Sequence, residues 1–286
     1  MVWTLQGKTA LVTGGTSGMG LATAEAFAAR GAHVLIVGRD PERGRSALER
    51  VASTAGAPEP RFLLADLSSM RQVRRVAAET GAVTDRLHVL VNNAGAYYWE
   101  RRETEDGLEM TFALNHLGGF LLTALLLDTL IASAPARVIN ISSGMHRRGR
   151  LVWDDLQRTR SYSGQDAYAQ SKLANVLFTV ECARRLHDTG VTVNAVGPGL
   201  VASQFGKGGT NVSARIYRLM TRVFGKTPEE AAETAVYLAS SPEVGEVTGA
   251  YWEKKSMKAP SPRATDPSDA SRLWRVSEDL AGLARD

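Results

Sequence analysis

The sequence predicts an α/β fold in which a doubly wound, mainly parallel sheet carries helices on both faces. Short β-branched runs alternate with longer segments of helical period, as in repeated βαβ units. A glycine-rich turn joins the first of these runs to the first helical segment. The 286 residues are enough for one large α/β domain that buries most of its apolar surface. We therefore expect a single domain over residues 1–286.

The first half of the chain alternates expected strands with expected helices. Strands are expected at residues 9–13, 33–37, 61–64 and 88–91, where β-branched and apolar residues cluster. Helical periods predict helices at residues 18–30, ending at Gly31, at 41–52 and at 69–80. Ser68 or Ser69 is placed to cap the third helix, because a serine oxygen accepts a free N–H of the first turn.

The same alternation continues through two long helices. Residues 108–130 predict one helix and residues 168–188 a second, which is closed by Gly190. Strands are expected before and after the second helix, at residues 136–141 and 191–196. These two long helices resemble helices that build dimers, so a homo-oligomer is one possibility.

The final third is less regular. Residues 207–224 have room for a short helix, and residues 227–240 predict a helix with Pro228 in its first turn. Residues 254–268 are rich in Pro, Ser and Lys, which predicts a loop. Residues 269–284 predict an amphipathic C-terminal helix that docks through Leu273 and Trp274, either on the body of the protein or on a partner.

Charge and cysteine content narrow the class of protein. The formal net charge is +4, but the basic residues are spread along the chain, which indicates solvated surface charge and not a nucleic-acid face. One cysteine, Cys182, excludes an internal disulfide and fits a reducing compartment. Residues 1–8 lack the pattern of a signal or anchor, and the apolar stretch 120–130 is too short to span a bilayer. We expect a cytoplasmic protein without a membrane anchor.

The turn after the first strand has the composition of a phosphate-binding loop. Residues 13–20 read TGGTSGMG and open the first helix. Glycines permit a tight turn and close backbone approach, while the helix N-terminus offers free N–H groups to a pyrophosphate. An ordinary turn is the alternative, but the flanking strand and helix favour dinucleotide binding. The residues expected at the nucleotide are Gly14, Thr16, Ser17, Gly18, Met19 and Gly20.

The residues after the second strand bear on the choice of dinucleotide. Arg39 follows this strand directly, and Arg43 lies one turn later. Guanidinium groups suit a 2′-phosphate through charge-assisted, planar contacts, so this pattern favours NADP(H). The alternative is that Asp40 binds the ribose 2′-hydroxyl of NAD(H) and Arg39 lies at the surface.

Two further strand ends carry expected nucleotide contacts. Asp66, in the segment Ala65-Asp66-Leu67, is placed to accept a hydrogen bond from the adenine amino group. After the fourth strand the chain reads NNAG, where small residues let the backbone approach a cofactor and the amides tie the loop to neighbouring strands. We expect nucleotide contacts from Leu67, Asn93, Ala94 and Gly95 as well.

A tyrosine and a lysine one helical turn apart are the expected proton-transfer pair. Tyr168 and Lys172 are spaced i, i+4, which places both side chains on one helix face. A phenol transfers protons poorly near neutral pH, and a nearby cation favours the phenolate. Ser143 can hydrogen-bond a substrate oxygen, and Asn115 can hold a water that connects Lys172 to solvent. Alone, Tyr168 and Lys172 would be an ordinary surface pair, but their occurrence after Asn115 and Ser143 in chain order favours catalysis.

The sequence predicts no metal site, because no His, Cys, Asp or Glu grouping has metal-ligand spacing.

Together TGGTSGMG, NNAG, Asn115, Ser143, YAQSK and a later Pro-Gly pair resemble the short-chain dehydrogenase/reductase family, over nearly the whole chain. The resemblance implies a Rossmann-type fold and hydride transfer by a nicotinamide cofactor. It also implies that Tyr168 is the acid or base, that Ser143 orients the carbonyl, that Lys172 holds the nicotinamide ribose and that Asn115 completes a proton relay. The implied contacts to the nicotinamide carboxamide are Pro198, Gly199, Val201 and Ser203, the last standing where the family usually has Thr.

A finer resemblance points to the retinol dehydrogenase-like branch, which includes plant protochlorophyllide reductases. It is carried by DGLE at residues 106–109, NHLG at 115–118, SKLAN at 171–175 and the long interval between Ser143 and Tyr168. The resemblance implies a carbonyl reductase or alcohol dehydrogenase for a lipophilic, bulky ketone or aldehyde, polycyclic ones included. Residues 203–227 are the segment expected to cover the substrate. They are Gly-rich and include several basic residues, which is unlike a cover for a lipophilic substrate.

Other readings stay open at this point. A regulator that senses NADP(H) without chemistry is disfavoured, because the chain keeps both Tyr168 and Lys172. A light-driven reductase of the protochlorophyllide type would bind pigment and act only under illumination. Tyr97, Tyr98 and Trp99 follow NNAG and would either stack on a flat substrate or anchor a loop.

Overall fold

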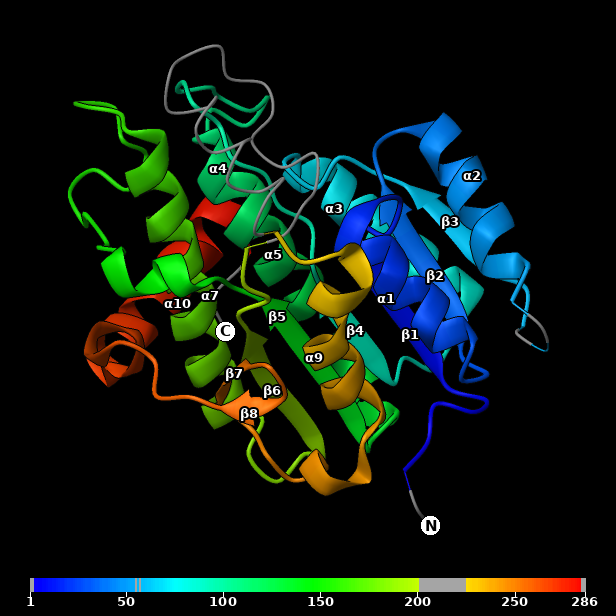
Figure 1. Cartoon of the computed structure of the whole chain (residues 1–286). Coiled ribbons are helices and arrows are strands. Elements are labelled where there is room, and N and C mark those ends of the chain that lie inside the picture. The colour runs from blue at the N-terminus through cyan, green and yellow to red at the C-terminus, as the bar shows by residue number, and fades with distance from the viewer. Residues whose placement is uncertain (1–2, 55, 57, 201–224, 284–286) are drawn as a thin grey trace.

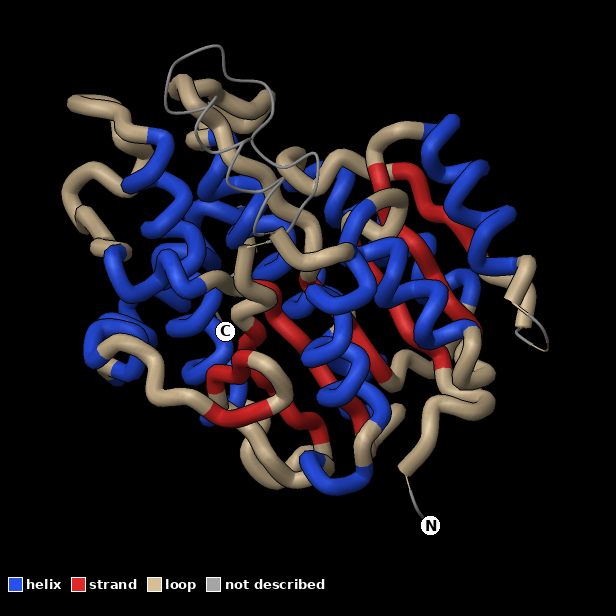
Figure 2. Tube along the Cα trace, viewed as in Figure 1, coloured by secondary structure: helices blue, strands red, loops and turns tan. Residues whose placement is uncertain are grey.

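The computed structural model describes residues 3–54, 56, 58–200 and 225–283. Within these residues one eight-stranded sheet has the order β3-β2-β1-β4-β5-β6-β7-β8. All neighbouring strands run parallel except β7 and β8, which are antiparallel. The predicted α/β class with a doubly wound parallel sheet is confirmed (Figure 2).

The six predicted strands all form, with bounds shifted by at most one residue. They are β1 Thr9–Thr13, β2 His33–Gly38, β3 Arg61–Leu64, β4 Val89–Asn92, β5 Ala136–Ile141 and β6 Val191–Val196. The central strands are buried on both faces, which explains their continuous apolar runs. Two short strands, β7 Tyr251–Glu253 and β8 Ser256–Met257, extend the sheet beyond the prediction.

Helices cover the two faces of the sheet separately (Figure 1). One face carries α1 Gly18–Ala28, α2 Pro41–Ala52 and α9 Pro228–Ser240. The other face carries α3 Met70–Val83, α5 Gly118–Leu125 and α7 Gly164–Arg185. Ser69, one of the two predicted residues, caps α3 by accepting a hydrogen bond from Gln72 N.

The predicted continuous helix over residues 108–130 is wrong. The segment forms α4 Met110–Phe112, a π-helical turn at Ala113–Leu117, α5, and α6 Leu127–Ala132. A π-turn inserts an extra residue into the helical ladder, which apolar periodicity does not show. Gly118 follows the π-turn and lies against the carbonyl oxygen of Leu67, where any Cβ would collide.

The DGLE segment proves to fix the start of this broken helix. The buried carboxylate of Glu109 accepts hydrogen bonds from Thr111 N at 2.8 Å and Phe112 N at 2.7 Å. Asp106 accepts a hydrogen bond from Met70 N, the first residue of α3, at 2.9 Å. Negative charge at a helix N-terminus is stabilising, so one short segment anchors the N-termini of two helices that follow strands of the parallel sheet.

The C-terminal part departs from its prediction in two ways. The loop expected at residues 254–268 contains β8 and a 3₁₀ turn at Pro262–Thr265, because backbone pairing with β7 outweighs the Pro- and Ser-rich composition. The last helix, α10, spans Pro267–Ala281 and starts two residues early, since Asp266 caps it.

Helix α10 docks on the body of the protein. The ring of Trp274 lies 5.1 Å from that of Phe120 on α5 and 5.9 Å from that of Phe178 on α7. The guanidinium of Arg185 lies 4.2 Å from the centre of the same ring. The face formed by α5 and α7 is therefore covered by this chain's own helix. No helix in the described ranges is long and apolar enough to cross a membrane.

Candidate active site

The predicted functional residues gather at the carboxyl edge of the sheet. Because β1 to β6 are parallel, the segments that follow them all leave from one edge (Figure 1). Ligands of open α/β sheets bind at this edge. The segments are the glycine turn after β1, Arg39 after β2, Asp66 after β3, Asn93 after β4, Ser143 after β5 and Pro198 after β6.

The glycine turn has the geometry of a phosphate cradle. Gly14 and Gly18 have φ of +65° and +53°, a left-handed conformation that favours glycine. A Cβ at Gly20 would collide with the carbonyl of Gly14 and with the Asn93 amide. Ser17 precedes α1 and does not cap it with its side chain, so the first-turn N–H groups face a prospective ligand.

The loop after β4 is tied to the glycine turn, as predicted. Asn93 Nδ2 donates to the carbonyl of Thr13 at 2.8 Å. The hydroxyl of Thr13 accepts hydrogen bonds from Asn93 N at 2.9 Å and Ala94 N at 3.0 Å. Gly14 packs against Ala94, so the two loops form one rigid wall at the carboxyl edge.

Asp40 and Arg39 have different roles. The carboxylate of Asp40 caps α2, accepting hydrogen bonds from Glu42 N and Arg43 N at 3.1 Å each, and lies 3.4 Å from Arg43 Nε. The side chain of Arg39 is 61% exposed, and Nη1 lies 3.7 Å from Asp66 Oδ2. The other oxygen of Asp66 accepts hydrogen bonds from Ser68 N and Oγ. Arg39 and Asp66 thus lie together, while Asp40 is committed to the helix.

Lys172 is buried beside Tyr168. Its Nζ donates to the carbonyl of Ile141 at 3.0 Å and lies 5.5 Å from the centre of the Tyr168 ring. Burial lowers the pKa of Lys172 to about 8. Tyr168 is half-buried, so its ring borders both the protein interior and the open edge.

Asn115 lies within the π-turn and is firmly held. Its Oδ1 accepts a hydrogen bond from Ala96 N at 2.8 Å, and its Nδ2 donates to Ala96 O at 3.0 Å and to Ser171 Oγ at 3.1 Å. A Cβ at Gly95 would stand 3.2 Å from Asn115 Oδ1 and 3.5 Å from Lys172 Nζ. A side chain at Gly95 would therefore crowd the Asn115 amide and contact the Lys172 ammonium.

Ser143 begins a 3₁₀ turn at the end of β5. Its hydroxyl oxygen accepts a hydrogen bond from Met145 N at 3.2 Å, which leaves the hydroxyl hydrogen to donate. Its carbonyl accepts from His146 Nδ1 at 2.7 Å, and His146 Nε2 accepts from Ser261 N at 3.2 Å. Burial lowers the pKa of His146. This buried histidine supports Ser143, a role that sequence reasoning missed because Ser261 is distant in sequence.

Among the aromatic residues after NNAG, Tyr97 lies against Tyr168. The Tyr97 ring is 4.7 Å from that of Trp99 and 5.6 Å from that of Tyr168. Tyr162 donates to the carbonyl of Tyr98 at 3.0 Å, which fixes the segment against the start of α7. The stacking of Tyr97 or Trp99 on a substrate stays a prediction.

The segment after β6 is described only in part. Gly199 has a φ of +88°, and Lys226 N donates to the carbonyl of Leu200 at 2.9 Å. Val201 and Ser203 lie outside the described residues. So do the short helix expected at residues 207–224 and most of the segment 203–227 expected to cover the substrate.

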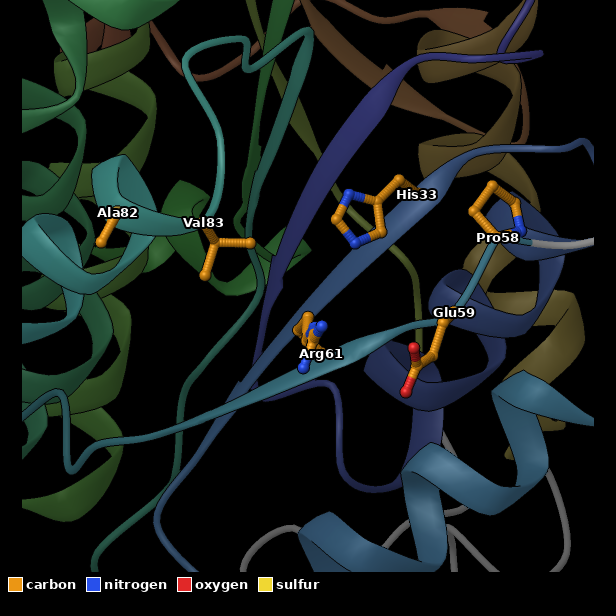
Figure 3. Close-up of a pocket in the computed structure, with 6 residues that line it drawn as sticks. All are labelled: His33, Pro58, Glu59, Arg61, Ala82 and Val83. Atoms are coloured by element: carbon orange, nitrogen blue, oxygen red, sulfur yellow. The ribbon is translucent and has the colours of Figure 1, made fainter.

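A separate pocket lies at the opposite edge of the sheet. Figure 3 shows its lining, with His33 at the start of β2 and Arg61 at the start of β3, near Glu59 and Val83. Burial and the charge of Arg61 lower the pKa of His33. The pocket is removed from the glycine turn, since it borders the first residues of strands whose last residues lead to the site. No group of metal-ligating side chains occurs in the described part of the chain.

Comparison with known proteins gives concordant results. The profile described as short chain dehydrogenase matches residues 8–211. Retinol dehydrogenase 13 of Homo sapiens is 42% identical over 285 residues, covering 98% of this chain and 86% of that protein. Retinol dehydrogenase 14 of Homo sapiens is 42% identical over 300 residues, covering 98% of this chain and 88% of that protein.

Solved structures agree in fold. An uncharacterised protein from Mycobacterium paratuberculosis superposes with a TM-score of 0.79 at 32% identity, covering 99% of this chain and 96% of that one. An NADP active-site complex of Pseudomonas aeruginosa RhlG superposes with a TM-score of 0.69 at 29% identity, covering 88% of this chain and 96% of that one.

Proposed function

This chain belongs to the short-chain dehydrogenase family, and on that premise we propose that it is an NADP(H)-dependent carbonyl reductase or alcohol dehydrogenase. The substrate class is a lipophilic ketone or aldehyde, polycyclic ones included. The observation that carries the proposal is the placement of buried Lys172 beside Tyr168, at the edge where the glycine cradle opens.

The residues present fit a nicotinamide dinucleotide. A Cβ at Gly14 or Gly20 would fill the space between the glycine turn and the loop after β4, so the cradle depends on glycine at both positions. The free N–H groups at the start of α1 suit a pyrophosphate. When bound, the nicotinamide supplies or accepts the hydride.

The protein groups would handle the proton. In the reducing direction Ser143 donates a hydrogen bond to the substrate carbonyl oxygen, and Tyr168 donates its phenolic proton to that oxygen as negative charge develops. The Lys172 ammonium stabilises the resulting phenolate, and the carbonyl of Ile141 holds this ammonium in place. In the oxidising direction the Tyr168 phenolate takes the alcohol proton.

The preference for NADP(H) is supported by the two groups after β2. The carboxylate of Asp40 caps the N-terminus of α2, whereas the side chain of Arg39 is exposed and lies next to Asp66. Arg39 can therefore turn to a 2′-phosphate, with Arg43 one turn away.

Replacing Arg39 with Ala should raise the KM for NADPH about tenfold and change the KM for NADH less than about twofold. The expected loss is at the low end for a charge-assisted contact, because the side chain is 61% exposed. Steady-state kinetics with both cofactors measures it. Arg45→Ala is the matched control, since Arg45 lies on α2, six residues after Arg39, and pairs with Glu42 at 2.8 Å. An equal loss with both cofactors would count against recognition of a 2′-phosphate.

The lipophilic substrate class is supported by the relatives and by the site. Two similar proteins bear the name retinol dehydrogenase. The Tyr97 ring lies beside that of Tyr168, and the Trp99 ring packs against Tyr97. Helix α10 covers the α5 and α7 face, so we propose that any homo-oligomer forms through another surface.

A panel of ketones, aldehydes and alcohols, assayed with NADPH and with NADH, tests the function. We expect turnover of lipophilic carbonyl compounds in the dark, with NADPH preferred. Binding of NADPH without turnover of any compound would instead favour a cofactor-sensing regulator. Turnover only under illumination would favour a light-driven reductase.

A further inference from the structure

Asn175 lies one helical turn after Lys172 and shares its anchor. The carbonyl of Ile141, the last residue of β5, accepts hydrogen bonds from Lys172 Nζ and from Asn175 Nδ2, both at 3.0 Å. Lys172 and Asn175 are buried, with 3% and 5% of their surface exposed. Two donors on α7 therefore hold one carbonyl at the end of the strand that leads to Ser143.

The same amide also holds the π-turn. Asn175 Nδ2 donates to the main-chain carbonyl of Asn115 at 2.9 Å. The side chain of Asn115 is held by Ala96 and Ser171, so Asn175 secures the remaining end of this residue. π-turns are frequent at functional sites, and here a single amide joins the turn to the strand end.

A buried relay fixes the orientation of that amide. Both hydrogens of Nδ2 are donated to carbonyls, so Asn175 Oδ1 must accept from His116 Nδ1, at 3.3 Å. Burial lowers the pKa of His116 to about 4, so the ring is neutral and its Nε2 accepts from the Ser277 hydroxyl at 2.9 Å. Helix α10, which carries Ser277, thereby completes the support.

We propose that Asn175 is a positioning residue for proton transfer, because it fixes the Ile141 carbonyl that directs the Lys172 ammonium toward Tyr168. Lys172 has a long side chain, and the Ile141 carbonyl is its hydrogen-bond anchor. If that carbonyl rotates away, the ammonium follows it and stabilises the Tyr168 phenolate less. The kinetic test of this inference rests on the proposed function, whereas the titration of Tyr168 needs no substrate.

The ionisation of Tyr168 tests the proposal without any substrate. Ultraviolet titration near the phenolate band, with the Tyr168→Phe spectrum subtracted, isolates this phenol. Tyr97 and Tyr251, its phenolic neighbours on the loop after β4 and on β7, cancel in the difference. We expect Asn175→Ala to raise the titration midpoint of Tyr168 by about one pH unit. We expect the same direction for Asn175→Leu, which has a similar size and no charge but cannot donate the two hydrogen bonds.

Thr179→Val is the matched control. Thr179 lies one turn further along α7, is fully buried, and hydrogen-bonds Asn140 Nδ2 at 2.9 Å and the carbonyl of Asn175 at 2.8 Å. Its loss removes a buried hydroxyl from the same helix without touching the carbonyls of Ile141 or Asn115. The titration midpoint in this control should stay at the wild-type value.

Kinetics adds a second readout. In Asn175→Ala, kcat should fall about 10- to 100-fold while the KM for NADPH changes less than about twofold, because the glycine cradle is unchanged.

If Asn175 variants fail to fold, Ser277→Ala provides a second test. It removes the hydrogen bond to His116 Nε2 and should shift the titration midpoint of Tyr168 in the same direction by a smaller amount. Folded Asn175 variants with the wild-type midpoint would overturn the proposal. Absence of turnover across the substrate panel would defeat the proposed function and leave the titration test intact.

Discussion

Replacing Tyr168 with Phe should lower kcat for carbonyl reduction by about 10³-fold, the size of effect that a positioned proton donor contributes. Phenylalanine keeps the ring that packs against Tyr97 at 5.6 Å and removes only the hydroxyl. Without it, Ser143 can still donate a hydrogen bond to the substrate oxygen, but no phenolic proton is transferred. NADPH binding, measured by fluorescence titration, should be largely intact because the glycine cradle is unchanged.

Tyr237→Phe provides the control for loss of a phenol. Tyr237 lies on α9, at a distance in sequence and structure from the carboxyl edge, and donates to Glu243 at 3.0 Å. This variant should turn over substrate at the wild-type rate. If Tyr168→Phe retained more than about a tenth of the wild-type kcat, Tyr168 would not be the proton donor.

The parts of this site that sequence predicts are those with a local signal. The glycine turn and the NNAG loop are contiguous motifs at strand ends, and α/β alternation determines on which edge they meet. The i, i+4 spacing of Tyr168 and Lys172 predicts a shared helix face, and the 5.5 Å between ammonium and ring agrees.

The parts that sequence did not predict depend on contacts between distant segments. The π-turn at Ala113–Leu117 adds one residue to a helix whose apolar pattern looks continuous. Strand β7 has three residues, too few for a periodic signal, and forms because the sheet edge at β6 offers backbone partners. His146 and Asn175 acquire their roles from Ser261 and Asn115, which periodicity cannot bring together.

The finer motifs gain a physical meaning from the same contacts. The DGLE segment is a capping device, since Asp106 and Glu109 bind the N-termini of α3 and α4. In NHLG, Gly118 admits the carbonyl of Leu67, and His116 supports Asn175 of the SKLAN segment. Two motifs that resemblance alone had grouped, NHLG and SKLAN, are therefore linked by hydrogen bonds beside the proton-transfer pair.

Replacing Lys172 with Met should abolish most turnover and yet stabilise the cofactor-free protein. Burial lowers the pKa of Lys172 from 10.5 to about 8, so keeping the ammonium charged at pH 7 costs about 3 kcal/mol of folding free energy. Methionine has a similar length and no charge, but its presence costs the hydrogen bond to Ile141, about 1 kcal/mol. We expect a net gain of about 2 kcal/mol at pH 7, measured by chemical denaturation.

The pH dependence distinguishes this cause from better packing. Below pH 8 the lysine is protonated in both the folded and unfolded states, so the full penalty is present in the wild type. Between pH 8 and 10.5 the folded protein has released the proton while the unfolded chain retains it, so wild-type stability rises and the advantage of Lys172→Met shrinks. Other groups titrate in the same range; burial lowers the pKa of Arg137 to about 10, for example. Their contributions cancel when the two proteins are compared at each pH. Lys255→Met, which alters an exposed lysine paired with Glu233 at 2.9 Å, should show no such convergence. A Lys172→Met protein that is less stable than the wild type at pH 7 would contradict this prediction. It would mean that interactions beyond the Ile141 carbonyl offset the free-energy cost of burying the Lys172 ammonium.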